Sequence, residues 1–148
     1  MCQNIISGDC FKVALDSEGK RAVRYIYFFS ILAVEMDQPG NGELLTALAE
    51  LIRKSTRNAD LLCWIEHQQL SLILHHAEGP NAHSIGERIR ERVENNNLEN
   101  GQCRRTISVG GACFPTHAAD TQSLFLIANE MLDRARSWGG NRVILPDI

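Results

Sequence analysis

Two short apolar runs joined by a tight polar turn restrict most strongly how this chain can fold. The runs extend from Asp60 to Ile65 and from Leu70 to Leu74, and a turn-forming stretch that begins at Arg57 precedes them. Runs of this length bounded by polar turn residues predict a β-hairpin. Residues 57–74 are therefore expected to form a turn, a strand, a tight turn and a second strand.

The rest of the chain alternates between helical and strand patterns. Residues 26–36 are rich in aromatic and aliphatic side chains and predict a strand buried on both faces. Leu44, Leu48 and Ile52 recur at helical spacing, as expected of an amphipathic helix on a sheet. By the same criteria helices are predicted at 11–24, 44–52, 83–94 and 123–137, and strands at 26–36, 60–65, 70–74, 106–114 and 142–145.

The predicted order α-β-α-β-β-α-β-α-β contains a β-α-β-β-α-β unit of the ferredoxin-like type. It indicates an α/β fold with a mixed central sheet flanked by helices. A length of 148 residues with 44% hydrophobic content suits a single domain over residues 1–148. This layout supports many unrelated activities, so it assigns no function by itself.

Composition and charge exclude several classes of function. The formal net charge of −3 gives no general attraction to nucleic acid. The longest apolar stretch, Tyr25 to Val34, is too short for a membrane helix, and residues 1–4 lack the layout of a secretory signal. We therefore expect a cytoplasmic protein that neither binds nucleic acid nor inserts into a membrane.

Neither the cysteines nor the histidines predict a metal centre. The five cysteines are scattered without Cys-x-x-Cys spacing, and Cys63 and Cys113 fall in apolar strand patterns typical of buried thiols. His75 and His76 are adjacent at a strand end, so their side chains are expected on opposite faces of the sheet. A shared metal is then excluded, and a solvated strand end is the expected role.

Several motifs in a fixed order resemble those of one protein family. They are Glu18 and Arg21-Ala22 before Phe29-Ser30-Ile31-Leu32, Glu35-Met36-Asp37, Arg57-x-x-Asp60, Thr106-Ile107-Ser108-Val109-Gly110, Ala128-Asn129, Ala135-Arg136, and Gly139-Gly140-Asn141-Arg142-Val143. In this order and with these gaps, the chain resembles the GGDEF domains of the diguanylate cyclases along nearly its whole length. The resemblance implies a GGDEF-like, nucleotidyl-cyclase-like fold with an N-terminal helix at about 11–24 and a core at about 25–148.

The family signature is replaced at all five of its positions, which here are Glu66, His67, Gln68, Gln69 and Leu70. Glu35 keeps one carboxylate for the magnesium ions that cyclisation of GTP needs, but Gln68 and Gln69 are neutral amides. Glu66 and His67 stand where glycines let the triphosphate approach.

A third requirement for cyclisation is also missing. Only Gln38-Pro39-Gly40 replaces the longer segment that recognises guanine in active members. The resemblance thus implies a degenerate domain without cyclase activity, cofactor or metal. A plain polar hairpin turn is the favoured interpretation of residues 66–69, ahead of a new acid–base pair at Glu66 and His67.

The product-sensing motif of the family is retained. Arg57 and Asp60 match its Arg-x-x-Asp, and Arg88 lies in the Glu-Arg-Ile-Arg context of the supporting arginine. An arginine can grip phosphate or the O6/N7 edge of guanine, and a carboxylate can accept from the N1 and N2 donors. These three residues are therefore the expected binding site for cyclic di-GMP.

Alternatives remain open for the residues and for the whole chain. Asp60 can cap the turn before its strand, and Arg88 can belong to the solvated face of an amphipathic helix. A receptor that dimerises with its ligand and acts on a downstream protein is the favoured function. The alternative is a pseudo-enzyme used for dimerisation or protein docking without nucleotide, and a GTP-binding regulatory domain is disfavoured by the missing guanine segment.

Overall fold

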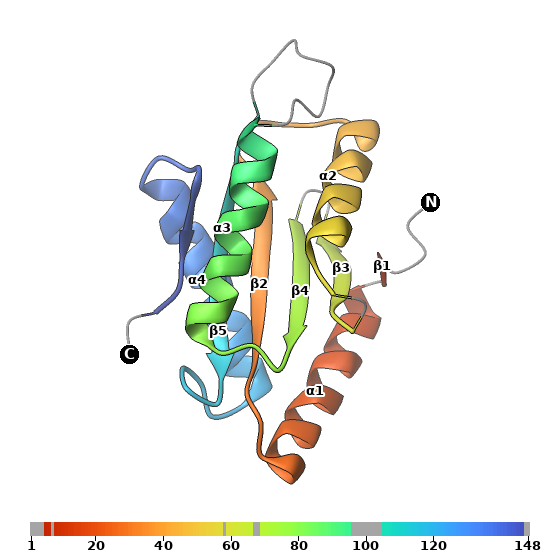
Figure 1. Ribbon diagram of the computed structural model, residues 1–148, viewed down its shortest axis with the longest axis vertical. Helices are drawn as coiled ribbons and strands as arrows, with labels where there is room; N and C mark the ends of the chain where they lie inside the picture. Colours follow the sequence, from red (N-terminus) through yellow and green to blue (C-terminus); the bar gives the residue numbers. More distant parts are fainter. Residues whose placement is uncertain (1–4, 7, 58, 67–68, 96–104, 147–148) are drawn as a thin grey trace.

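The fold is a mixed β-sheet between two layers of helices, as predicted (Figure 1). The structure, a computed structural model, describes residues 5–6, 8–57, 59–66, 69–95 and 105–146. Its elements in chain order are β1 (Ile5–Ile6), α1 (Gly8–Tyr25), β2 (Phe29–Met36), α2 (Gly42–Ser55), β3 (Leu61–Glu66), β4 (Gln69–His75), α3 (Gly79–Asn95), β5 (Ile107–Phe114), α4 (Thr121–Ser137) and β6 (Arg142–Ile144).

The sheet has the strand order β1-β3-β4-β2-β5-β6. Strand β2 pairs antiparallel with both β4 and β5, and β3 pairs antiparallel with β4 as the predicted hairpin. The outer strands β1 and β6 pair in parallel with β3 and β5. The ferredoxin-like unit therefore runs from β2 to β5, and the two-residue strand β1 is an addition that the sequence pattern did not predict.

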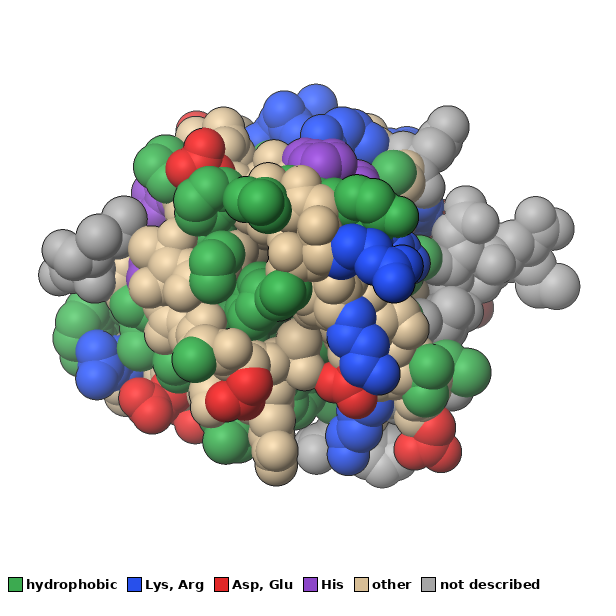
Figure 2. Space-filling view, turned by 90° about the horizontal axis from the view of Figure 1, so that it is seen from below, with side chains coloured by type: hydrophobic (Ala, Val, Ile, Leu, Met, Phe, Trp, Pro, Cys, Tyr) green, Lys and Arg blue, Asp and Glu red, His purple; other side chains and the backbone are tan. Residues whose placement is uncertain are grey.

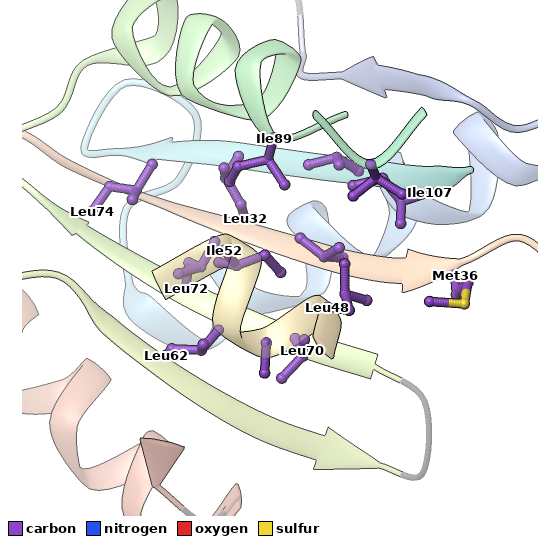
Figure 3. Close-up of a cluster of buried hydrophobic side chains, with 14 of the residues drawn as sticks. Leu32, Met36, Leu48, Ile52, Leu62, Leu70, Leu72, Leu74, Ile89 and Ile107 are labelled. Carbon is purple, nitrogen blue, oxygen red and sulfur yellow. The ribbon is translucent and has the colours of Figure 1, made fainter. Parts of the chain in front are cut away.

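The core has one cluster of apolar side chains on each face of the sheet. On one face, side chains of α2 such as Leu48 and Ile52 pack over Leu62, Leu70 and Leu72, beside Ile89 of α3 (Figure 3). On the other face, α1 and α4 bury a second cluster that includes Phe11, Phe29, Ile73, Phe114 and Leu124. Strand β2 is thus buried on both faces, as its composition predicts.

Several helix ends follow directly from their sequence. Asn41 caps α2 by accepting a hydrogen bond from the backbone N–H of Leu44 at 2.8 Å, and Asp120 caps α4 by accepting from Ser123 N–H at 2.7 Å. Gly139 and Gly140 follow α4 with φ of 111° and 74°, a conformation in which glycine is favoured.

The predicted first strand begins at Phe29 and not at Ile26. Ile26 has a φ of 57° and is 89% exposed, and the N–H of Tyr27 bonds back to the carbonyl of Ala22 at 3.1 Å. Residues 26–28 therefore form the exit from α1. A hydrophobic composition alone does not reveal this left-handed turn.

The predicted placement of His75 and His76 on opposite faces of the sheet is wrong. His76 adopts a φ of 58°, and its ring lies with its centroid 4.1 Å from that of His75. The left-handed residue ends the alternation of side chains that an extended strand requires. Both rings also contact Tyr27, with centroids at 5.1 Å for His75 and 4.3 Å for His76.

Candidate ligand-binding pocket and signature turn

A pocket of about 380 Å³ lies where α2 ends, β3 begins, β4 ends and α3 passes over them. We call it the Arg57 pocket, and its lining residues are Thr56, Arg57, Asp60, His76, Ala77, Asn81, Ser84, Ile85 and Arg88. The fold thus brings together the three residues predicted to bind a ligand. In Figure 2, which views the molecule from this lower end, histidine side chains lie beside a group of Lys and Arg side chains.

Asp60 has a buried carboxylate that holds the turn together. One oxygen accepts the backbone N–H of Arg57 at 3.0 Å, and the other accepts the backbone N–H of His75 at 3.0 Å. Both oxygens also lie near the Arg57 guanidinium, at 3.4 and 3.5 Å. With its side chain fully covered, Asp60 positions Arg57 and joins the start of β3 to the end of β4. The covered carboxylate is therefore not exposed to accept hydrogen bonds from a ligand in this conformation.

Arg57 extends from this buried anchor to the surface. Its side chain is 58% exposed, and Nη2 also donates to the backbone carbonyl of His75. These bonds use Nε and Nη2, which form one edge of a group that carries five N–H donors. A guanidinium held in this way is preorganised to bind phosphate or the O6/N7 edge of guanine.

Arg88 reaches the same pocket from α3. Its Nη2 donates to the carbonyl of Ser55 in the last turn of α2 at 2.7 Å, and Arg92 donates to the Ser55 hydroxyl at 2.8 Å. A basic side chain at a helix C-terminus satisfies an otherwise open carbonyl. Arg88 therefore links α3 to α2 while it contributes positive charge to the pocket wall.

His76 is a pocket residue that the sequence did not assign to the site. His76 has left-handed backbone and lines the Arg57 pocket, and its ring also contacts Tyr27, which does not line the pocket. Histidine adopts this conformation more often than most residues. Nothing in the local pattern, however, distinguishes His76 from a solvated strand end.

The buried carboxylate of Glu18 contacts this end of β4 from α1. Glu18 of α1 lies 2.6 Å from Nδ1 of His75 and accepts hydrogen bonds from the Tyr27 hydroxyl and from Arg21, each at 2.9 Å. Burial, with the hydrogen bond to Glu18 and its negative charge, raises the pKa of Tyr27 to about 12. Tyr27 therefore stays protonated and connects α1 to the histidine pair.

The signature turn lies at the opposite end of β4. His67 and Gln68 lie outside the described residues, as does the side chain of Glu66. Gln69 donates from its amide to Asn129 of α4 at 2.6 Å, and Leu70 is buried in the core. The described part of the turn is thus tied to α4 by a neutral hydrogen bond.

Glu35 in β2 and Asp37 directly after it both have partners within the domain. Glu35 lies opposite Gln69 in the sheet and forms an ion pair with Arg136 of α4. Asp37 accepts from the hydroxyls of Thr106 and Ser108, each at 2.6 Å, and from the backbone N–H of Asn141 at 2.8 Å. Within the described residues, no three His, Cys, Asp or Glu side chains are grouped to hold a metal ion.

None of the helices in the described part of the chain is long and apolar enough to cross a membrane. The structure contains one chain, so the expected homodimer stays a prediction.

Comparison with known proteins agrees with this architecture. The chain is 34% identical over 113 residues to the uncharacterized protein YhcK of Bacillus subtilis. This alignment covers 72% of the chain and 32% of YhcK. It is 26% identical over 114 residues to the probable diguanylate cyclase DgcT of Escherichia coli, covering 74% of the chain and 25% of DgcT. The chain thus spans a quarter to a third of the length of these relatives.

A solved GGDEF domain has the same fold. The GGDEF domain of DgcB from Caulobacter crescentus, crystallised in complex with cyclic di-GMP, superposes with a TM-score of 0.86 at 16% identity. The superposition covers 98% of this chain and 90% of the crystallised GGDEF domain. The family model described as diguanylate cyclase, GGDEF domain, matches residues 39–142, which is more than half of the chain. The chain therefore belongs to the GGDEF domain family.

Proposed function

We propose that this chain is a GGDEF domain without cyclase activity that binds cyclic di-GMP in the Arg57 pocket. The convergence of Arg57, Asp60 and Arg88 on one pocket carries the proposal. These residues come from a turn and from a helix that are distant in sequence. Their common location supports the assignment of the Arg-x-x-Asp motif as a binding motif.

The chemistry of the pocket suits a guanine dinucleotide. Arg57 and Arg88 supply positive charge and N–H donors, whereas the negative charge of Asp60 is buried beneath Arg57. The ligand has two phosphates and two guanines, and arginine binds both kinds of group through paired hydrogen bonds. The solved DgcB domain was crystallised with the same dinucleotide, which makes it the first ligand to test.

The absence of cyclase activity rests on the signature positions. Gln68 and Gln69 offer neutral amides where magnesium prefers anionic oxygens, and the Glu35 carboxylate is already paired with Arg136. Magnesium binding would have to break that ion pair without gaining new carboxylates. A domain that has lost the cyclase reaction but keeps the site for cyclic di-GMP acts as a receptor for this dinucleotide.

A docking module without nucleotide is the second candidate. Apolar side chains are exposed where α1 leads into β2, and they include Val23, Tyr25 and Ile26. Figure 2 shows hydrophobic side chains distributed over this end of the molecule. Such residues are suited to a protein contact.

Titration calorimetry with cyclic di-GMP separates the two functions. We expect the wild-type protein to bind and Arg57→Ala to bind at least about tenfold more weakly, since a lost charge-assisted contact costs ~1.5–3 kcal/mol. Asp60→Asn should also weaken binding, because the buried anchor of Arg57 loses its charge. Arg88→Ala should have a smaller effect than Arg57→Ala if Arg88 mainly screens phosphate.

Two controls keep this test specific. Arg134→Ala removes an exposed arginine from α4, on the other face of the sheet, and Gln69→Ala changes the signature turn. Both should bind within about twofold of wild type, because neither side chain lines the Arg57 pocket. A wild-type protein that gives no binding heat at 100 μM ligand, or an Arg57→Ala variant that binds normally, overturns the receptor function. The docking function would then take its place.

A further inference from the structure

We propose that the imidazole of His76 is the surface on which one guanine base stacks in the Arg57 pocket. This inference rests on the proposed function and adds a contact of a different chemical kind. Arg57 and Arg88 can hold the edges and phosphates of a nucleotide, whereas a base also has two flat faces. Among the described residues that line the pocket, His76 alone carries an aromatic ring.

The backbone of His76 turns its side chain away from the path of the strand. A strand that continued regularly past His75 would send the next side chain to the other face of the sheet. The φ of 58° at His76 prevents this and brings its ring to 4.1 Å from that of His75. Left-handed backbone is unfavourable for residues other than glycine, although asparagine, aspartate and histidine tolerate it best.

Neighbouring groups restrict the ring before any ligand binds. Tyr27 contacts His76 with centroids 4.3 Å apart, and the hydroxyl of Tyr27 is anchored on buried Glu18 at 2.9 Å. A ring supported in this way loses little side-chain entropy on binding, which favours stacking. The exposed part of His76 lies on the wall that it shares with Arg57 and Arg88.

The size and chemistry of the pocket agree with one base and its phosphate. Its volume of about 380 Å³ is near the lower end of the range for small-molecule sites. Stacking is tolerant of base type because every base has a π-face. His76 should therefore contribute affinity for the dinucleotide, whereas hydrogen bonds from Arg57 should contribute the preference for guanine.

The test compares the affinity of His76 variants for cyclic di-GMP by calorimetry. His76→Asn removes the ring but keeps a residue type that tolerates the left-handed backbone, so the change tests stacking and not strain. We expect His76→Asn to weaken binding at least about fivefold. His76→Tyr, which restores an aromatic face, should bind within about threefold of wild type.

His83→Asn is the matched control. His83 is also an exposed histidine, but it lies on α3 outside the Arg57 pocket. Its replacement should leave the affinity unchanged. Thermal unfolding of each variant, followed by circular dichroism, identifies any variant that does not fold.

Proton NMR of the wild-type imidazoles provides a readout that a merely structural role would not change. A guanine stacked on His76 shifts its ring protons upfield through the ring current of the base, whereas the protons of His83 stay in place. This measurement decides the question even if a His76 variant does not fold.

The possible outcomes separate the stacking contact from the receptor function. If wild type binds, Arg57→Ala loses affinity and His76→Asn binds as wild type does, the stacking contact is overturned and the receptor function stands. If His76→Asn binds weakly but His76→Tyr does not recover and no upfield shift occurs, stacking is also overturned. A wild-type protein that binds no cyclic di-GMP overturns both.

Discussion

Two aspartate side chains organise the structure around individual hydrogen bonds. Asp37 and Asp60 each hold groups from separate segments. Asp37 joins the start of β5 to the start of β6, and Asp60 joins the start of β3 to the end of β4. A carboxylate that accepts several such bonds stabilises its surroundings, and its removal leaves buried donors unsatisfied. Asp60 thereby determines where the exposed arginine of the pocket lies.

His117 should make stability depend on pH. Its Nδ1 accepts from the backbone N–H of Cys113 at 2.9 Å, its buried Nε2 has no partner among the described residues, and burial lowers its pKa. The unfolded chain therefore takes up the proton first as the pH falls below about 6.5. Stability is fully present above that pH and decreases as the pH falls toward the lower folded pKa.

Urea unfolding at pH 7.5 and pH 5 measures this dependence. The wild-type midpoint should be lower at pH 5. In His117→Asn, which keeps an acceptor for Cys113 N–H but cannot titrate, the difference between the two midpoints should shrink. Equal pH dependence in the two proteins would show that His117 does not contribute.

The contact between β5 and α4 depends on the absence of a side chain. A Cβ atom on Gly110 would lie 2.0 Å from the backbone nitrogen of Leu132 and 2.4 Å from the carbonyl oxygen of Ala128. The helix backbone therefore rests directly on the strand. All eight residues of β5 are buried, so this contact lies in the interior.

Gly110→Ala should destabilise the fold by about 3 kcal/mol or more, because the clash is with backbone atoms that cannot move aside. Guanidinium unfolding of the purified variant measures the loss. Gly42→Ala is the matched control, since Gly42 has no atom within 4 Å of its added Cβ and lies in the first turn of α2. Alanine at that position should be neutral or stabilise by up to ~1 kcal/mol. An equal loss in both variants would contradict the close packing of α4 on β5.

The signature turn and the Arg57 pocket lie at opposite ends of β4. The strand begins at Gln69 beside the signature turn and ends at His75 beside the Arg57 pocket (Figure 1). A strand of this length separates the two ends by roughly 20 Å. Changes at the signature turn therefore leave the Arg57 pocket in place, as the proposed receptor function requires.

The purified protein should make no cyclic di-GMP from GTP with magnesium or manganese. The physical reasons are the neutral amides of Gln68 and Gln69, the replacement of the glycines by Glu66 and His67, and the short 38–40 connection. Chromatography of the reaction against a no-protein blank and an active family member checks this. Product above the blank would contradict it, and restoring glycine and acid at the turn alone should not create activity.

The sequence by itself determined the order and type of the elements from α1 to β6 and the identity of the family, but not the short strand β1. Hydrophobic periodicity and turn residues are local properties, so the hairpin of β3 and β4 and the helices around the sheet could be predicted. The residues Arg57, Asp60 and Arg88 were identified because their motifs resemble those of the family. The structure confirms the mixed α/β fold and places those three residues in one pocket.

Only the tertiary structure decided what each residue of the site does. The carboxylate of Asp60 turns inward because the N–H of His75, distant in sequence, lies within hydrogen-bonding distance. His76 lines the pocket with left-handed backbone and contacts Tyr27, and Arg88 is held by the end of α2. Each of these outcomes depends on contacts between segments that are far apart along the chain, and local patterns carry no information about such contacts.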